Sequence, residues 1–260
     1  PDFSGRHRRF QLEVATKFQA AQAGSQLPDI VVFSDVWWFR HFLADSIIPL
    51  GNALEAAEVD TSDSAGLFAD YQYADAQWAV PWARSTPLFY YNKSHWSAAG
   101  LEEALPDLGL QKTTAGKFDL GVGFLPGGPE ETSPVCPTGG AGVGIPKKIA
   151  KENQLAAAKF IGFLTNPENT VKFSAATGYM PVRTSADTSS LLAANPLAGE
   201  AIKQLDVTRP QDYARASSGA DQEIAKAVAE IVTQEADVKT YNPLKGVLEG
   251  IYTSEVKDKI

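Results

Sequence analysis

Short apolar runs of strand-forming residues alternate along this chain with amphipathic helical segments, and this alternation limits the possible folds strongly. Residues 30–33 are Ile-Val-Val-Phe, which indicates a buried parallel strand, and residues 11–23 indicate a helix before it. Further strands are expected at 77–82 and 87–92, with Pro81 placing the first of them at an edge or near an end. Strands that alternate with helices imply an α/β fold with a mostly parallel sheet.

The clearest helix signal lies in the second half of the chain. Residues 152–164 are predicted to form an amphipathic helix with Ala156, Phe160, Phe163 and Leu164 on one face. Such a face is expected to pack against the rest of the protein.

The chain after this helix also carries the residues that begin and end helices. Asn166 is expected to cap a second helix, with Pro167 at its first position and Gly178 as its stop. A strand is expected at 118–124, with 141–145 as its neighbour. Three more helices are predicted, at 196–205, 220–234 and 243–252.

Composition excludes several classes of protein. The chain has 260 residues, 44% of them hydrophobic, which is enough for one large domain or two lobes. Its 31 acidic and 23 basic residues give a net charge of −8, and nonspecific nucleic-acid binding needs a basic surface instead. The basic run at 6–9 is interpreted as solvated charge near a terminus. No apolar stretch approaches the roughly 18 residues that span a bilayer.

Motifs for catalysis are mostly missing. The three histidines have no metal-ligand spacing, and the single cysteine excludes an internal disulfide. The glycine-rich stretch 139–144 is followed by Pro146 instead of a helix start, which argues against a dinucleotide site. A catalytic triad around His41 or His95 remains an alternative, although lone histidines are more often packed or solvated. We therefore expect no enzymatic activity, no metal and no cofactor.

Aromatic residues are concentrated in one part of the chain. All five tryptophans lie between positions 37 and 96. They are interpreted either as the core of one lobe or as a cleft wall against which a polyol or a quaternary ammonium group packs. The two interpretations are equally weighted for Trp37, Trp38 and Trp82, whereas the core is favoured for Trp78 and Trp96. Asp35 follows the strand at 30–33, at the end where ligands bind in open α/β sheets.

Several stretches, taken together and in order, resemble one known family. The chain resembles the extracellular solute-binding proteins of ABC importers, in particular the Ugp-type branch that binds glycerol-3-phosphate or glycerophosphodiesters, and its actinobacterial glycerophosphocholine-binding members. The stretches that carry this resemblance are 35–39, 83–93, 98–101, 136–142, 160–169, 177–183 and 211–215.

The resemblance implies a two-lobed periplasmic-binding-protein fold of type II, with lobes linked by a hinge near 85–87 and 175–177. Lobe I would comprise 1–86 and 116–176, and lobe II would comprise 87–115 and 177–260. The family places most of a second lobe where this chain has only 102–116, so lobe II is expected to be truncated.

The resemblance also implies one group of ligand contacts around the glycerol end of the ligand. Asp35 stands where the family has a carboxylate that accepts hydrogen bonds from glycerol hydroxyls, and Ser85 stands where a hydroxyl contacts the ligand. Gly139 and Gly140 resemble paired glycines whose backbone N–H groups face the glycerol or phosphate. Trp37 and Trp38 are expected to flank the same ligand.

A second group of implied contacts concerns the phosphate. Tyr179 and Arg215 resemble the phosphate-binding pair of the family, and a guanidinium fork matches phosphate oxygens. The alternative for Arg215 is a surface ion pair with Asp212 or Asp221.

The function implied by the resemblance is that of a substrate-binding component that captures glycerophosphocholine or sn-glycerol-3-phosphate and delivers it to permease subunits. Such a protein would work outside the cytoplasm as a lipoprotein, held at the membrane by a lipid anchor that this chain does not contain. The alternatives are a sugar-binding protein of the same superfamily and, from another class, a glycerophosphodiester hydrolase.

Overall fold

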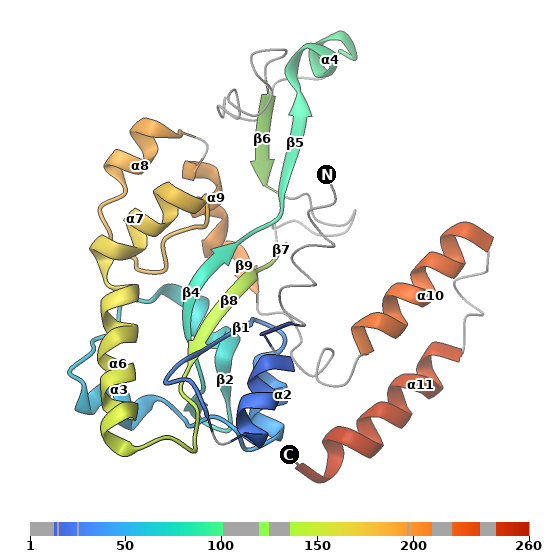
Figure 1. Ribbon diagram of the computed structural model, residues 1–260. Coiled ribbons are helices and arrows are strands. Elements are labelled where there is room, and N and C mark those ends of the chain that lie inside the picture. Colours follow the sequence, from blue (N-terminus) through green and yellow to red (C-terminus); the bar gives the residue numbers. More distant parts are fainter. Residues whose placement is uncertain are drawn as a thin grey trace.

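The centre of the molecule is a three-stranded sheet with the strand order β1-β8-β4 (Figure 1). The computed structural model describes residues 13–14, 16–24, 26–100, 120–124, 136–196, 198–209, 220–234 and 243–259. In this part of the chain the sheet comprises β1 (Val31–Ser34), β8 (Gly139–Gly144) and β4 (Val80–Ser85). The helix expected at 11–23 is present at 13–14 and 16–23, and its Phe18 is buried.

The prediction of a mostly parallel sheet is wrong for the described strands. β8 runs antiparallel to β1 on one side and to β4 on the other, and Val143 lies opposite both Val32 and Val80. The continuous apolar run of β1 instead reflects burial on both faces. Val31 and Phe33 belong to one core cluster, whereas Val32 packs against another.

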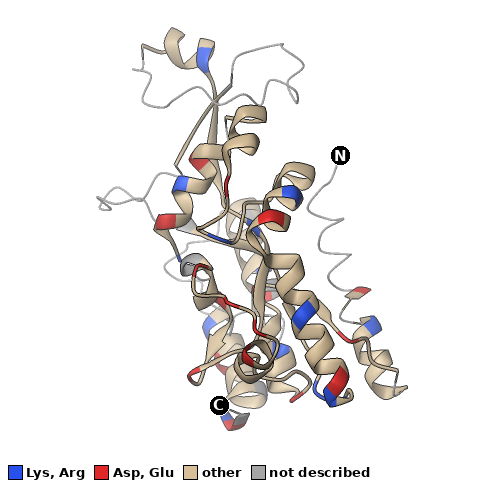
Figure 2. Ribbon diagram, turned by 90° about the vertical axis from the view of Figure 1, so that its left-hand side faces the viewer, with Lys and Arg blue, Asp and Glu red and all other residues tan. Residues whose placement is uncertain are grey.

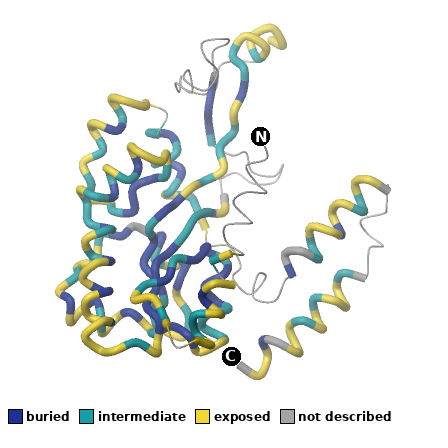
Figure 3. The backbone as a smooth tube through the Cα atoms, in the orientation of Figure 1, coloured by how far each residue is buried: buried dark blue, intermediate teal, exposed yellow. Residues whose placement is uncertain are grey.

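Two core clusters cover the two faces of this sheet. The first core cluster consists of Phe18, Val31, Phe33, Trp38, Phe39, Ile47, Tyr71, Ala79 and Val256. The second core cluster consists of Leu50, Leu54, Ala57, Val80, Val143, Ile145, Ala157, Ala158 and Ile161. Helix α2 (Trp38–Leu43) contributes residues to the first cluster, and α3 (Gly51–Ala56) and α6 (Lys151–Thr165) contribute residues to the second. Figure 3 shows the buried residues concentrated along the three strands.

The glycines of β8 allow aromatic rings to lie directly on the strand. A Cβ atom at Gly142 would lie 2.6 Å from the Tyr71 ring, and one at Gly144 would lie 2.7 Å from the Phe33 ring. Both rings belong to the first core cluster. The glycine-rich stretch therefore serves close packing in the centre of the sheet.

Helix α6 was correctly predicted, but its buried face was not. Phe160 is 45% exposed and Phe163 is 58% exposed, so the predicted apolar face points outward. The helix instead packs against α3 and β4 through a different face. The buried residues of this face are Gln154, Ala157, Ala158, Ile161 and Thr165. Small alanines let the helices approach closely, which the larger phenylalanine rings would prevent.

Beyond the sheet, β4 continues into a two-stranded arm. Strand β5 (Leu88–Asn92) pairs antiparallel with β6 (Leu120–Phe124), and α4 (Lys93–Ala98) follows β5 (Figure 1). The prediction that 141–145 neighbours the strand at 118–124 is therefore wrong. Gly121 of β6 lies opposite Tyr91 of β5, and a Cβ atom on Gly121 would overlap the tyrosine ring. β8 pairs instead with β1 and β4 in the central sheet.

Helix α7 (Pro167–Thr177) begins and ends as its sequence predicts. The side chain of Asn166 accepts a hydrogen bond from the backbone N–H of Asn169 at 2.8 Å, and Gly178 ends the helix with a φ of 82°. Positive φ is a conformation that glycine adopts at little cost.

The remaining elements lie around this body. They are η1 (Ala65–Tyr71), β2 (Gln72–Tyr73), β3 (Ala76–Gln77), β7 (Cys136–Pro137), α8 (Ser189–Ala194), α9 (Ala198–Gln204), η2 (Leu205–Val207), β9 (Thr208–Arg209), α10 (Ala220–Gln234), α11 (Pro243–Ile251), η4 (Tyr252–Val256) and η5 (Lys257–Lys259). The helices predicted in the last third are confirmed, and α8 was not predicted. β7 and β9 form the only parallel pair among the described strands. The predicted short segment 102–116 lies outside the described residues.

Three further features of the described residues concern charge, membrane-spanning helices and potential metal ligands. The ribbon in Figure 2 shows acidic and basic residues interspersed among the described elements. Within the described residues, no helix is long and apolar enough to cross a membrane. No group of three or more potential metal ligands is present in that same part of the chain.

The close packing of β8 predicts a large effect of a single methyl group. Gly142→Ala should destabilise the fold by roughly 1–3 kcal/mol, because the added Cβ atom overlaps the Tyr71 ring. Gly246→Ala in α11 is the matched control, because nothing lies within 4 Å of its added Cβ atom. Urea unfolding followed by circular dichroism measures both. Equal stability of the two variants would show that Tyr71 does not press on β8.

Candidate ligand-binding site

The antiparallel sheet brings the ends of three strands together. Because β8 runs opposite to β1 and β4, its first residues lie beside the last residues of both neighbours. Ser85 lies opposite Gly139, and the backbone N–H of Asp35 donates to the carbonyl oxygen of Gly140 at 3.2 Å. Four of the predicted site residues, Asp35, Ser85, Gly139 and Gly140, therefore lie at one end of the sheet.

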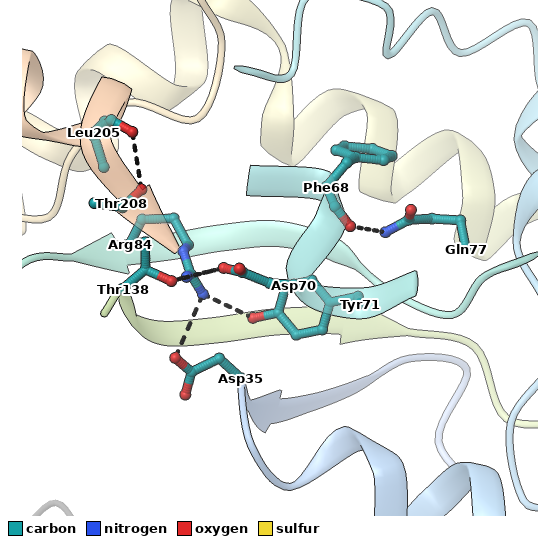
Figure 4. Close-up of polar contacts among 9 residues, drawn as sticks. All are labelled: Asp35, Phe68, Asp70, Tyr71, Gln77, Arg84, Thr138, Leu205 and Thr208. Atoms are coloured by element: carbon teal, nitrogen blue, oxygen red, sulfur yellow. Dashed lines mark hydrogen bonds and ion pairs between the residues drawn. The ribbon is translucent and has the colours of Figure 1, made fainter. Parts of the chain in front are cut away.

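A fully buried arginine lies at the same end. Arg84 is 0% exposed, and Figure 4 shows its guanidinium among four polar side chains. Its Nη1 donates to the Tyr71 hydroxyl at 3.1 Å and lies 3.8 Å from Oδ2 of Asp35. Its Nη2 donates to Asp70 Oδ2 and to Thr138 Oγ1. We call Asp35, Asp70, Tyr71, Arg84 and Thr138 the Arg84 network.

Sequence reasoning missed the central member of this network. Arg84 lies in β4 beside the buried Ala83 and before the exposed Ser85. In the sequence it lies between the strands predicted at 77–82 and 87–92, so no strand pattern marked it. Its partners Asp70 and Thr138 are 14 and 54 residues away, so no local pattern indicates them.

The network holds two carboxylates against one guanidinium, and burial changes how they titrate. Burial raises the pKa of Asp35 to about 6, the Arg84 charge opposes this shift, and the Asp70 charge adds to it. Burial also raises the pKa of the Tyr71 hydroxyl far above its usual value. Tyr71 is therefore a neutral hydrogen-bond partner at any physiological pH. Asp35 is the group that can change its charge near neutrality.

The tryptophans near Asp35 belong mainly to the core. Trp38 is 0% exposed and packs edge-on against Phe39 and Tyr71, with ring centroids 5.5 Å and 6.3 Å away. This burial supports the core interpretation for Trp38 and gives no support to a ligand contact. Trp37 is 8% exposed, and the guanidinium of Arg40 lies 4.7 Å from its ring centroid.

The other tryptophans pack against neighbouring aromatic rings. The expected core role of Trp78 agrees with its packing, since its ring lies 4.8 Å from that of Phe42. Trp96 lies 4.8 Å from the ring of Tyr91 on the arm. Both tryptophans are partly buried.

Tyr179 ends a ladder of three half-buried aromatic rings. Trp82 stacks on Phe173 at 4.7 Å, and Phe173 stacks on Tyr179 at 5.9 Å with only 8° between the ring planes. This stacking fixes the ring plane of Tyr179 at the point where the chain leaves α7. Its predicted partner Arg215 lies outside the described residues.

The titration of Asp35 predicts a pH dependence of stability. Its folded pKa of about 6 lies above the ordinary value of 3.8, so the folded state binds the proton first on acidification. As the pH falls from 7.5 to 4.5, the free energy of unfolding of wild type should therefore rise by about 2 kcal/mol relative to that of Asp35→Asn. Urea unfolding across this pH range measures the difference.

Two features of this experiment guard against misinterpretation. Burial lowers the pKa of His41 to about 4, which reduces stability as the pH falls, but this histidine is present in both proteins and cancels. Asp206→Asn, an exposed change, is the control and should leave the pH profile parallel to that of wild type. A constant difference between wild type and Asp35→Asn would contradict the raised pKa.

Comparisons with known proteins place this chain in a family. Residues 13–114 and residues 96–200 match two families that share the description bacterial extracellular solute-binding protein. The sn-glycerol-3-phosphate-binding periplasmic protein UgpB of Salmonella typhimurium is 31% identical over 111 residues, which cover 40% of this chain and 20% of that protein. UgpB of Escherichia coli K12 is 29% identical over 107 residues, with the same coverage. The match thus spans about a fifth of the length of these relatives.

Solved structures extend the similarity over nearly the whole chain. The sugar-binding protein MalE of Xanthomonas citri matches with a TM-score of 0.72 at 14% identity, and the match covers 91% of this chain and 86% of that chain. UgpB of Mycobacterium tuberculosis in complex with glycerophosphocholine has a TM-score of 0.82 at 32% identity, covering 95% of this chain and 89% of that chain. These matches confirm the predicted type II periplasmic-binding-protein fold. The chain belongs to the UgpB-type bacterial extracellular solute-binding proteins.

Proposed function

We propose that this protein is the substrate-binding component of an ABC importer and that it captures glycerophosphocholine or sn-glycerol-3-phosphate. The observation that carries this proposal is the similarity to mycobacterial UgpB, which was solved with glycerophosphocholine and matches at 32% identity over 89% of its chain. Curated relatives named as sn-glycerol-3-phosphate-binding proteins support the same class of ligand. The protein binds and releases its ligand without chemical change.

The end of the sheet supplies groups suited to the glycerol part of such a ligand. The Asp35 carboxylate accepts hydrogen bonds from two neighbouring hydroxyls, and Ser85 adds an exposed hydroxyl beside it. Gly139 and Gly140 present backbone groups without side chains at the start of β8. An anion such as Asp35 repels phosphate at close range, so the phosphate lies toward Tyr179 and Arg215.

The two-lobed arrangement suggests how the ligand is enclosed. Lobe I would comprise 1–86 and 116–176, lobe II would comprise 87–115 and 177–260, and the lobes would close about the ligand by hinge motion. The closed form would be recognised by permease subunits outside the cytoplasm, with a lipid anchor holding the protein at the membrane.

A second candidate function is the binding of oligosaccharides. The similarity to sugar-binding proteins such as MalE of Xanthomonas citri, at a TM-score of 0.72, favours this alternative. At 14% identity this similarity shows the fold alone, so it carries less weight than the match to UgpB.

Isothermal titration calorimetry with a ligand panel tests the proposed function. Wild type should bind glycerophosphocholine and sn-glycerol-3-phosphate, and should bind phosphocholine, maltose and trehalose poorly. Asp35→Ala should lower the affinity for the first two ligands alike, by about 10–100-fold, because each ligand loses the acceptor for its glycerol hydroxyls. Asp206→Ala, at an exposed position, is the control. Tight binding of maltose or trehalose alone would instead support the sugar-binding alternative.

Arg215 should contribute more to phosphate binding than any other charged residue discussed. Arg215→Ala should cost roughly 2–5 kcal/mol of binding free energy, because the guanidinium–phosphate contact implied by the family resemblance would be lost. Lys172→Ala removes an exposed cation on α7 and should have no effect on affinity. Calorimetry with glycerophosphocholine compares the two variants. An unchanged affinity for Arg215→Ala would place this residue in a surface ion pair.

A further inference from the structure

Arg84 contacts three segments at one end of the central sheet, which we call the three crossings. Its own strand, β4, passes through Ser85 and Thr86 into the arm. Thr138 links β7 to β8, and its hydroxyl accepts a hydrogen bond from the guanidinium of Arg84. Met180 follows α7, and its backbone N–H donates to the carbonyl oxygen of Arg84 at 2.8 Å. Each of the three crossings therefore contacts the same residue.

Groups beyond the sheet hold the far side of these crossings. The backbone N–H of Thr138 donates to the carbonyl oxygen of Arg209 in β9 at 3.2 Å. The buried Gln204 of α9 donates through Nε2 to the Thr86 hydroxyl at 2.5 Å and to the carbonyl oxygen of Pro87. The crossings are thus fixed by Arg84 on one side and by polar contacts from α9 and β9 on the other.

Stability alone is a weak reason for burying such a cation. Removing a guanidinium and two carboxylates from water costs free energy that their mutual attraction repays only with good geometry. Apolar residues of similar volume would fill the same space without this cost. The two Nη atoms of Arg84 instead contact different groups. Nη2 donates to Asp70 and Thr138, whereas Nη1 donates to Tyr71 and faces Asp35.

We propose that Arg84 is the positioning residue of the ligand site, which keeps the Asp35 carboxylate charged and oriented as an acceptor for ligand hydroxyls while fixing the three crossings. This inference rests on the proposed function. Arg84 acts through Asp35, because its own side chain is fully buried and both of its Nη atoms contact members of the network.

Electrostatics gives this role a consequence that a purely structural role lacks. Among the described residues, the titratable groups facing Asp35 are Arg84 from β4 and Asp70 and Tyr71 from η1. Arg84 favours the carboxylate form of Asp35, whereas burial and Asp70 favour the protonated form. A protonated Asp35 donates a hydrogen bond and loses acceptor capacity. Ligand affinity should therefore fall on acidification, with a midpoint near pH 6 in wild type.

Two variants should move this midpoint in opposite directions. Arg84→Met removes the favourable charge at similar volume, so the midpoint should rise by at least about one pH unit. At pH 7 a rise of one unit should lower the affinity for glycerophosphocholine about twofold and a rise of two units about tenfold, and the affinity should recover at pH 8.5. Asp70→Asn removes the opposing carboxylate, so the midpoint should fall below that of wild type. Arg84→Lys retains the charge and should keep the midpoint near that of wild type.

Calorimetry with glycerophosphocholine between pH 5 and 8.5 measures these midpoints. Ile161→Val, a core change in the second core cluster, controls for general loss of stability and should move neither midpoint nor affinity. A raised midpoint in Arg84→Met together with a lowered midpoint in Asp70→Asn would establish the positioning role. A loss of affinity that is equal at every pH would overturn it and leave Arg84 as a structural ion pair.

A second measurement separates this inference from the proposed function. The ionisation of Asp35 can be followed without ligand, through the pH dependence of urea unfolding relative to Asp35→Asn in each background. If wild type binds none of the ligands in the panel, the proposed function fails, and unfolding still shows whether Arg84 controls the charge of Asp35. Should Arg84→Met fail to fold, Arg84→Lys and Asp70→Asn decide the question.

Discussion

The buried guanidinium of Arg84 is the interaction on which the geometry of the site depends. A cation without access to water depends on partners within the protein, and here the two Nη atoms donate to η1 and to the segment before β8. Those segments cannot shift independently without leaving a buried charge unpaired. The relative positions of Asp35, Ser85 and Thr138 are therefore set by one side chain, although they come from distant parts of the sequence.

Close packing of β8 makes this arrangement possible. Tyr71 can reach Arg84 only because its ring lies flat on the strand at Gly142, where any side chain would collide with it. Trp38 packs edge-on against the same ring, with the two centroids 6.3 Å apart. The glycines of β8 and the fully buried tryptophan thus hold Tyr71 in place, and Tyr71 in turn positions the guanidinium.

Local patterns predicted most helices and several strands, but they did not predict how these elements assemble. Caps at Asn166 and Gly178 depend on neighbouring residues and were therefore correctly predicted. The buried face of α6 depends on how closely α3 approaches, so hydrophobicity alone wrongly placed Phe160 and Phe163 inside. Asp35 was correctly expected at the end of its strand, although the sheet around it is antiparallel. Arg84 went unrecognised because its partners are remote in sequence.

On the proposed function, the charge balance of the Arg84 network would favour the glycerol end of a ligand over its phosphate. Two carboxylates and one guanidinium leave the network with one net negative charge when Asp35 is ionised. A neutral diol gains hydrogen bonds from that charge, whereas a phosphate brought equally close would be repelled. If the ligand carries both groups, its phosphate must lie away from Asp35, and the stacked ring of Tyr179 provides a fixed surface outside the network. Orientation of a glycerophosphodiester then follows from electrostatics before any contact with the phosphate is made.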